Sequence, residues 1–339
     1  MKVFLVSGPR KNVIPGYWLY DKLKADFKNI ESIYIRKDDA TPRYLRTFKQ
    51  IWSVIKVLLQ ANKEDLILVY DNDTTGIYIA LALSFFRRKL IVYKINSMAK
   101  DKSKLYSPIK RLLVRQAYKN IYTSVNNNEI AHIYSSFLEL PLKHFIPIPD
   151  SISDLSDNVK IIKDCTEKGY IFMGGATHRD YNLFIEVARN LPQYKFVAVT
   201  FEQYKHFFTN APQNISVYYG LDEKAFSQKV ANSNIVFVPL TNDVQGGQLV
   251  IMQGALFKKP IITTESIAIH TYLDDKSAFL LPIGEKKKSI TIISELMSNK
   301  NLRLHMGEKA YKRISTFTTD SIYEEYKAKL FPSITEHNK

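Results

Sequence analysis

Two aspartates that follow a buried run of residues are the clearest acid–base candidates in the chain. Residues 66–70 are apolar enough to form a buried strand, and Asp71 and Asp73 come directly after it. At the carboxyl end of a parallel strand, a carboxylate faces the place where ligands bind and can take a proton from a substrate hydroxyl. The alternative is structural, because aspartate commonly caps helices and a helix is expected after Thr74.

A pair of glycines followed by an arginine could hold a phosphate group. Gly174 and Gly175 come at the end of the apolar run 170–173, and His178 and Arg179 precede the next expected helix. Glycines let the backbone approach a ligand, and the amides at a helix N-terminus favour an anion. Arg179 adds a charge suited to a diphosphate, and His178 beside it is a second candidate contact to a bound substrate. The alternative is a tight turn with its arginine on the surface.

A second glycine turn stands later in the chain. The apolar run 235–238 leads towards Gln245, Gly246 and Gly247, and the helix that follows carries Gln253 two turns beyond Gln245. A strand, glycines and a helix N-terminus therefore occur together twice, and both turns could bind one anionic ligand across the carboxyl ends of their strands. The alternative is an ordinary turn followed by a helix with polar faces.

The elements that must position these residues alternate between strand and helix along both halves of the chain. This alternation predicts parallel sheets covered by helices. We expect an α/β protein with two Rossmann-like domains in tandem and a cleft between them. The first domain spans residues 1–150, a linker spans 151–168 and the second domain spans 169–315. Residues 316–339 are expected to form a C-terminal helix and tail that return towards the first domain.

Composition limits the classes of protein that the chain could be. The single cysteine, Cys165, excludes a disulfide framework and a cysteine-rich metal site. Asp, Glu and His are not clustered at metal-ligand spacing, so we expect neither a metal nor a cofactor. No run approaches the roughly 18 apolar residues that span a bilayer, and no signal peptide is visible. We expect a soluble or peripheral protein in the cytoplasm.

The positive charge of the chain is concentrated in its first half. Residues 41–120 hold 16 Lys and Arg against 5 Asp and Glu, a net charge of +11 out of +15 for the whole chain. Within them, residues 42–61 predict a helix with a wide apolar face and a basic margin, which suits a membrane interface. The alternative is an amphipathic helix packed on a sheet. Nucleic acid is disfavoured as the partner, because no RNA-binding or helix-turn-helix signature accompanies the charge.

The second half resembles the donor-binding domain of GT-B glycosyltransferases, particularly the retaining family 4 and its bacterial polysaccharide relatives. The shared motifs are a glycine-rich strand end followed by Arg179, then Gln245 and Gln253 where the family has two glutamates, then Lys258-Lys259-Pro260-Ile261-Ile262. The ending, Phe279–Pro282 and then residues 302–313, is also similar. The resemblance covers residues 170–315 by motif and residues 1–150 by architecture alone.

The resemblance implies that the second domain binds a nucleoside-diphosphate sugar, by family frequency a UDP-sugar, without a metal. Gln245 would lie at the donor sugar and Gln253 at the ribose, while Gly220 and Leu221 would present backbone groups to the base. Glutamine keeps the hydrogen bonds of glutamate and loses its charge. A non-catalytic homologue that acts as the partner of another glycosyltransferase therefore remains the alternative.

The acceptor belongs on the first domain in this resemblance. A glycan or a lipid-linked, phosphate-bearing intermediate of capsule or exopolysaccharide synthesis would suit the basic charge. We expect a peripheral enzyme on an anionic membrane surface, at the inner face of a bacterial cell membrane. The residues expected on the acceptor and membrane side are Gly8, Arg10, Arg43, Arg46, Lys49, Trp52, Arg87, Arg88, Lys110 and Arg111.

Overall fold

The computed structural model divides the chain into two compact units. It describes residues 2–7, 18–34, 48, 51–52, 55–57, 59–62, 65–70, 90–92, 112, 115–117, 119, 121–152, 169–176, 178–244 and 246–332. The first unit comprises Met1–Pro149 together with Thr319–Lys339, and the second comprises Asp150–Thr318. Most of the expected linker, residues 153–168, lies outside the described residues. Each unit is described by itself below.

The first unit is built on a six-stranded parallel sheet in the order β2-β1-β3-β4-β5-β6. Its strands are β1 (Val3–Ser7), β2 (Ile30–Tyr34), β3 (Leu66–Tyr70), β4 (Leu90–Val92), β5 (Ile121–Val125) and β6 (Phe145–Pro147). Strands of such a sheet are buried on both faces and therefore read as continuous apolar runs. Leu66 to Val69 are accordingly all buried.

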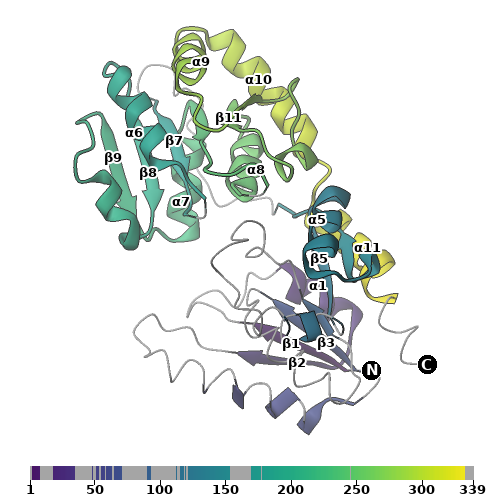
Figure 1. Cartoon of the computed structure of the whole chain (residues 1–339). Coiled ribbons are helices and arrows are strands. Elements are labelled where there is room, and N and C mark those ends of the chain that lie inside the picture. The colour runs from purple at the N-terminus through teal and green to yellow at the C-terminus, as the bar shows by residue number, and fades with distance from the viewer. Residues whose placement is uncertain are drawn as a thin grey trace. The chain divides into compact units, whose positions relative to one another are not determined.

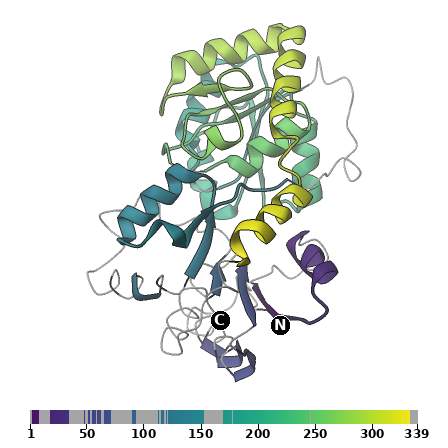
Figure 2. The same ribbon diagram turned by 90° about the vertical axis from the view of Figure 1, so that its right-hand side faces the viewer.

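The last segment of the chain packs on the first unit. Its helices are α11 (Thr319–Glu325) and the π-helical turn Tyr326–Leu330, and they lie beside α1 (Trp18–Asp26) and β5 (Figure 2). The buried hydroxyl of Tyr326 is hydrogen-bonded to that of Ser124, at 2.7 Å between oxygens. The helix α5 (Asn128–Leu138) and the 3-10 turn Leu142–His144 complete the described helices between β5 and β6.

The second unit contains another six-stranded parallel sheet, in the order β12-β11-β10-β7-β8-β9 (Figure 1). Its strands are β7 (Ile171–Gly174), β8 (Phe196–Thr200), β9 (Ile215–Tyr219), β10 (Ile235–Val238), β11 (Ile261–Thr264) and β12 (Phe279–Leu281). Its helices are α6 (Tyr181–Asn190), α7 (Glu223–Ala231), α8 (Gln248–Leu256), α9 (Lys286–Ser298) and α10 (Lys300–Ile314), with 3-10 turns at Glu202–Phe208 and Ile269–Thr271.

Helices cover both faces of this second sheet. Phe172 and Val236 pack with α7, α8 and α10 on one face. Ile171 and Met173 pack with α6 and α9 on the other. Neighbouring residues of one strand therefore belong to opposite cores, as the two-residue period of a strand requires. The predicted α/β fold class is confirmed, with parallel sheets and a Rossmann-like layering.

No described helix is long and apolar enough to cross a membrane.

Candidate functional site

The second sheet reverses its strand order between β7 and β10. From β7 the chain moves outward to β8 and β9, then returns to place β10 on the other side of β7. Open α/β sheets bind ligands outside the carboxyl ends of the strands at such a reversal, which is called the topological switch point. The loops after β7 and β10 carry the two glycine turns that the sequence singles out. The topology thus brings both turns to one switch point.

Backbone hydrogen bonds fasten the two loops to each other. Arg179 and Leu240 form an antiparallel bridge. The amide of Asp180 donates to the carbonyl of Pro239 at 2.9 Å, and the amide of Thr241 donates to the carbonyl of His178 at 3.0 Å. Groups carried by the two loops therefore hold fixed positions relative to each other.

Arg179 lies inside this pair of loops and is not the surface arginine of the alternative interpretation. Its side chain is 8% exposed, and its Nε donates to the carbonyl of Gly174 at 2.6 Å. A Cβ added at Gly175 would lie 2.5 Å from Nη2, and one added at Gly247 would lie 3.7 Å from Nη1. The guanidinium group therefore lies beside glycines from both turns, and Gly175 must lack a side chain for it to fit.

Burial also affects the charge of this arginine. Desolvation lowers the pKa of Arg179 to about 10, while the neighbouring phenols of Tyr181 and Tyr204 act in the opposite direction. The guanidinium group stays protonated near neutral pH. A buried, protonated guanidinium is a strong partner for a phosphate group, because its planar fork can make two parallel hydrogen bonds.

The two helices that begin at the switch point differ at their N-termini. Helix α6 is capped by Asp180, whose Oδ1 accepts from the amide of Leu183 at 2.9 Å. Helix α8 begins after Gly247, which has a φ of 77° and makes no side-chain cap. The expectation that the first turn offers an open helix N-terminus is wrong, because an acidic side chain occupies it. Helix α8 begins without a side-chain cap, so its N-terminus is the one better suited to an anion.

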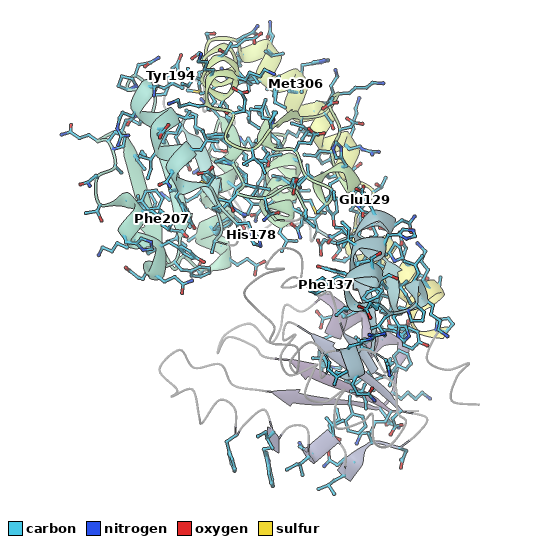
Figure 3. The ribbon with its side chains drawn as sticks, viewed as in Figure 1. Glu129, Phe137, His178, Tyr194, Phe207 and Met306 are labelled. Atoms are coloured by element: carbon cyan, nitrogen blue, oxygen red, sulfur yellow. The ribbon has the colours of Figure 1, made fainter. Side chains whose placement is uncertain are left out.

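His178 adopts a backbone conformation that side chains rarely adopt. Its φ is 58°, in the left-handed region, and its side chain is exposed. In Figure 3, His178 and Phe207 lie on one side of the second unit and Tyr194 lies on the opposite side. Tyr194 comes just before β8 begins, so His178 is on the side away from the start of that strand. Strained residues of this kind concentrate at functional sites. The observation is consistent with the expected role of His178 as a contact to a ligand.

Gln253 joins two helices of the second unit. It is 8% exposed, and its Nε2 donates to Oγ of Ser227 at 2.6 Å, which in turn donates to the carbonyl of Glu223 at 2.7 Å. The amide of Gln253 thus connects α8 to α7. This contact uses the amide group as a donor, which a carboxylate could not provide.

Gly220 and Leu221 follow β9, two strands away from β7. Gly220 has a φ of 61°, and its amide donates to the carbonyl of Thr200 at 2.9 Å. An added Cβ at Gly220 would meet nothing within 4 Å, whereas Leu221 is half-buried against the core. A ligand could therefore approach the backbone at Gly220. The expected contact between this backbone and the nucleotide base stays a prediction.

Several predicted site residues lie outside the described residues. Ser7 pairs with Tyr70 where β1 and β3 end, and these neighbouring strands mark the switch point of the first sheet. Gly8 and Asp71 follow them directly in the sequence. The residues without a described position are Gly8, Arg10, Arg43, Arg46, Lys49, Asp71, Asp73, Arg87, Arg88, Lys110, Arg111 and Gln245. Trp52 is described and is exposed.

The sequence interpretation did not include the hydroxyl groups that support the turns. Tyr181 is hydrogen-bonded to Oγ1 of Thr200 at 2.7 Å and donates to the carbonyl of Gly175 at 3.2 Å. Burial raises the pKa of Tyr181, so the phenol keeps its proton. Oγ1 of Thr264 accepts from the amide of Leu240 at 2.8 Å. The signal was the place of Thr200 and Thr264 at strand ends and of Tyr181 at the start of α6, where the sequence shows only ordinary polar residues.

A contact between a carboxylate and an imidazole near the second turn was also missed. Glu265 follows β11 directly, and its Oε1 lies 3.0 Å from Nε2 of His270. In the loop between Glu265 and His270, the amide of Ile267 donates to the carbonyl of Asp243, which lies next to the second turn. Among the residues that the structure describes, no group of three or more His, Cys, Asp or Glu side chains could hold a metal ion.

Two Rossmann-like domains with these parallel sheets define the GT-B architecture. Solved structures with this fold match nearly the whole chain. HepE of Anabaena in complex with UDP-glucose has a TM-score of 0.75 and 15% sequence identity, and the match covers 97% of this chain and 99% of HepE. Sucrose-phosphate synthase from Thermosynechococcus elongatus has a TM-score of 0.75 and 10% identity, covering 98% of this chain and 100% of its own.

WaaG, a glycosyltransferase involved in lipopolysaccharide biosynthesis, is also similar. Its TM-score is 0.70 at 11% identity, and the match covers 98% of this chain and 100% of WaaG. At such identities the likeness shows the fold. No protein-family model matches the chain, and no curated protein is similar to it in sequence.

Proposed function

We propose that the chain is a glycosyltransferase that uses a nucleoside-diphosphate sugar, with a UDP-sugar favoured. The observation that carries the proposal is the buried guanidinium of Arg179, fixed between two glycine turns and near the helix N-terminus after Gly247. Both features favour a diphosphate, and they meet at the switch point of the second sheet. HepE, which has the same fold, has been solved with UDP and with UDP-glucose.

The same groups suit the chemistry of transfer. When the bond between the sugar and the diphosphate breaks, negative charge grows on the leaving diphosphate. Arg179 and the amides at the start of α8 would stabilise that charge, which is the part that a metal ion plays in other transferases. We therefore propose transfer of a hexose without a metal. Asp71 or Asp73 would take the acceptor proton if the reaction inverts the configuration of the sugar.

The proposed acceptor is a glycan or a lipid-linked intermediate of bacterial surface polysaccharide synthesis. The net charge of +11 in residues 41–120 supports an acceptor that bears phosphate, or an anionic membrane surface that carries it. We propose that the enzyme works at the inner face of the cell membrane. The likeness in fold to WaaG, which is involved in lipopolysaccharide biosynthesis, supports the same context.

Calorimetric titration with UDP tests the donor site. Arg179→Ala should weaken UDP binding by at least tenfold, about 1.4 kcal/mol, because the diphosphate loses its buried charged partner. Arg189→Ala is the matched control, since Arg189 lies on the same segment of chain but is exposed and donates to the carbonyl of Asn210. Equal UDP affinity in the wild type and both variants would remove Arg179 from the site.

A non-catalytic GT-B homologue acting as a partner subunit is the second candidate. The contact between Gln253 and Ser227 favours it, because the side chain amide is already used in joining α7 and α8. Incubation of the purified chain with UDP-sugars separates the two functions. Hydrolysis or transfer of the sugar supports the enzyme, whereas UDP binding without turnover on any acceptor supports the partner subunit.

A further inference from the structure

Large apolar side chains of the first unit are exposed along one helical segment. The described residues between 48 and 60 are helical. Five of them form what we call the apolar stripe, with exposed fractions of 65% for Phe48, 47% for Ile51, 60% for Trp52, 39% for Ile55 and 80% for Leu59. Several large apolar side chains exposed along one helical segment indicate a site of interaction.

The side of this helical segment that faces away from the apolar stripe packs against the rest of the first unit. Val57 and Ala61 are buried, and the amide of Ala61 donates to the carbonyl of Val57 at 2.9 Å. Nζ of Lys56 lies 3.5 Å from Oε1 of Glu31 on β2. At about 100° per residue, the stripe lies roughly opposite Val57 around the helix. The described residues of the predicted apolar face are therefore turned to solvent, whereas the helix is attached to the unit through Val57 and Ala61.

We propose that the apolar stripe inserts into the interfacial layer of an anionic lipid bilayer, with the helix lying in the membrane plane. Among the described residues no helix is long and apolar enough to cross a bilayer, and a helix with an apolar face in a basic stretch suits the membrane interface. Tryptophan and phenylalanine are the side chains that membrane interfaces favour. The proposal deepens the proposed function by naming how the first unit meets the membrane.

Charge decides between a bilayer and a second copy of the chain. The stripe belongs to the stretch 41–120, which carries a net charge of +11. Two copies that met through this face would bring two such basic stretches together, whereas anionic lipid would neutralise them. An anionic bilayer is therefore favoured both by the apolar stripe and by the net positive charge of the sequence stretch that contains it.

Vesicle binding tests the proposal with the full-length chain. Co-sedimentation with phosphatidylcholine vesicles, with and without phosphatidylglycerol, should show binding that rises with anionic lipid. Trp52→Ser and Leu59→Ser should each weaken binding about tenfold, because each removes one large apolar side chain from the lipid. Leu304→Ser is the matched control, since Leu304 is 59% exposed, close to the 60% of Trp52, but lies on α10 of the second unit.

Fluorescence reports insertion directly. The chain has two tryptophans, so Trp18→Phe leaves Trp52 as the single reporter. Its emission should shift to the blue on anionic vesicles and be quenched by brominated acyl chains. The same variant without vesicles should remain monomeric. Stripe variants that bind vesicles as well as wild type, an unchanged emission, or self-association that the stripe variants abolish would each overturn the proposal.

The outcome is separable from that of the donor site. UDP titration of Trp52→Ser and Leu59→Ser should give wild-type affinity, because both residues belong to the first unit and the donor site to the second. Loss of vesicle binding with retained UDP binding supports the membrane surface by itself. Vesicle binding in a chain that binds no UDP would leave the stripe supported and refute the proposed donor.

Discussion

The space beside Arg179 gives the sharpest prediction. Gly175 has a φ of 90°, where an L-residue costs roughly 1–2 kcal/mol in backbone strain. A Cβ at this position would also lie 2.5 Å from Nη2 of Arg179, so the guanidinium group must move. That movement weakens its hydrogen bond to the carbonyl of Gly174, which is of a charged type worth about 1.5–3 kcal/mol. Gly175→Ala should therefore lose stability and affinity for UDP together.

Gly284 provides a control, because it has the same kind of backbone strain as Gly175 but does not lie beside Arg179. Gly284 has a φ of 75°, and an added Cβ there would meet nothing within 4 Å. Gly284→Ala should lose a similar amount of backbone free energy, about 1 kcal/mol, with UDP affinity unchanged. Urea unfolding measures the stability of both variants, and calorimetry measures their UDP affinity. If Gly175→Ala binds UDP as tightly as Gly284→Ala does, the position of the guanidinium group does not govern donor binding.

Three further predictions concern stability, catalysis and metals. Arg303→Ala should destabilise the second unit by about 1–3 kcal/mol in urea unfolding, because its buried Nη1 donates to the carbonyls of Leu296 and Met297 at the end of α9; wild-type stability would contradict this. Asp71→Asn or Asp73→Asn should leave folding intact and reduce turnover about 10²–10⁴-fold if one of them is the base. Normal turnover in both variants would instead indicate retention of configuration with assistance from the donor phosphate, which NMR of the product anomer decides. Activity should survive EDTA, and loss that Mg²⁺ or Mn²⁺ restores would refute the metal-free mechanism.

Sequence reasoning predicted the strands of the second unit to within about a residue, because parallel strands buried on both faces are simple apolar runs. The run 235–238 coincides with β10, and the run 170–173 differs from β7 by one residue. The 3-10 turn at Glu202–Phe208 was not predicted, since its aromatic side chains show neither helical nor strand periodicity.

The site shows where local patterns stop being informative. The cap at Asp180 was visible as an aspartate three residues before Leu183, yet it was not used as a cap signal. The burial of Arg179 could not be read from its neighbours, because it depends on two loops that are far apart in the sequence. Periodicity likewise predicted an apolar face on residues 42–61, but which face of a helix meets the sheet is decided by the rest of the unit.

The two units also differ in continuity along the chain. The second unit is one uninterrupted stretch, Asp150–Thr318, whereas the first unit needs residues from both ends. Tyr326 and Leu330 are fully buried in that first unit, against strands made about two hundred residues earlier in the same chain. During synthesis on the ribosome, the second unit can therefore complete its core first. The core of the first unit, although its strands emerge earlier, stays incomplete until residues 319–332 have been synthesised.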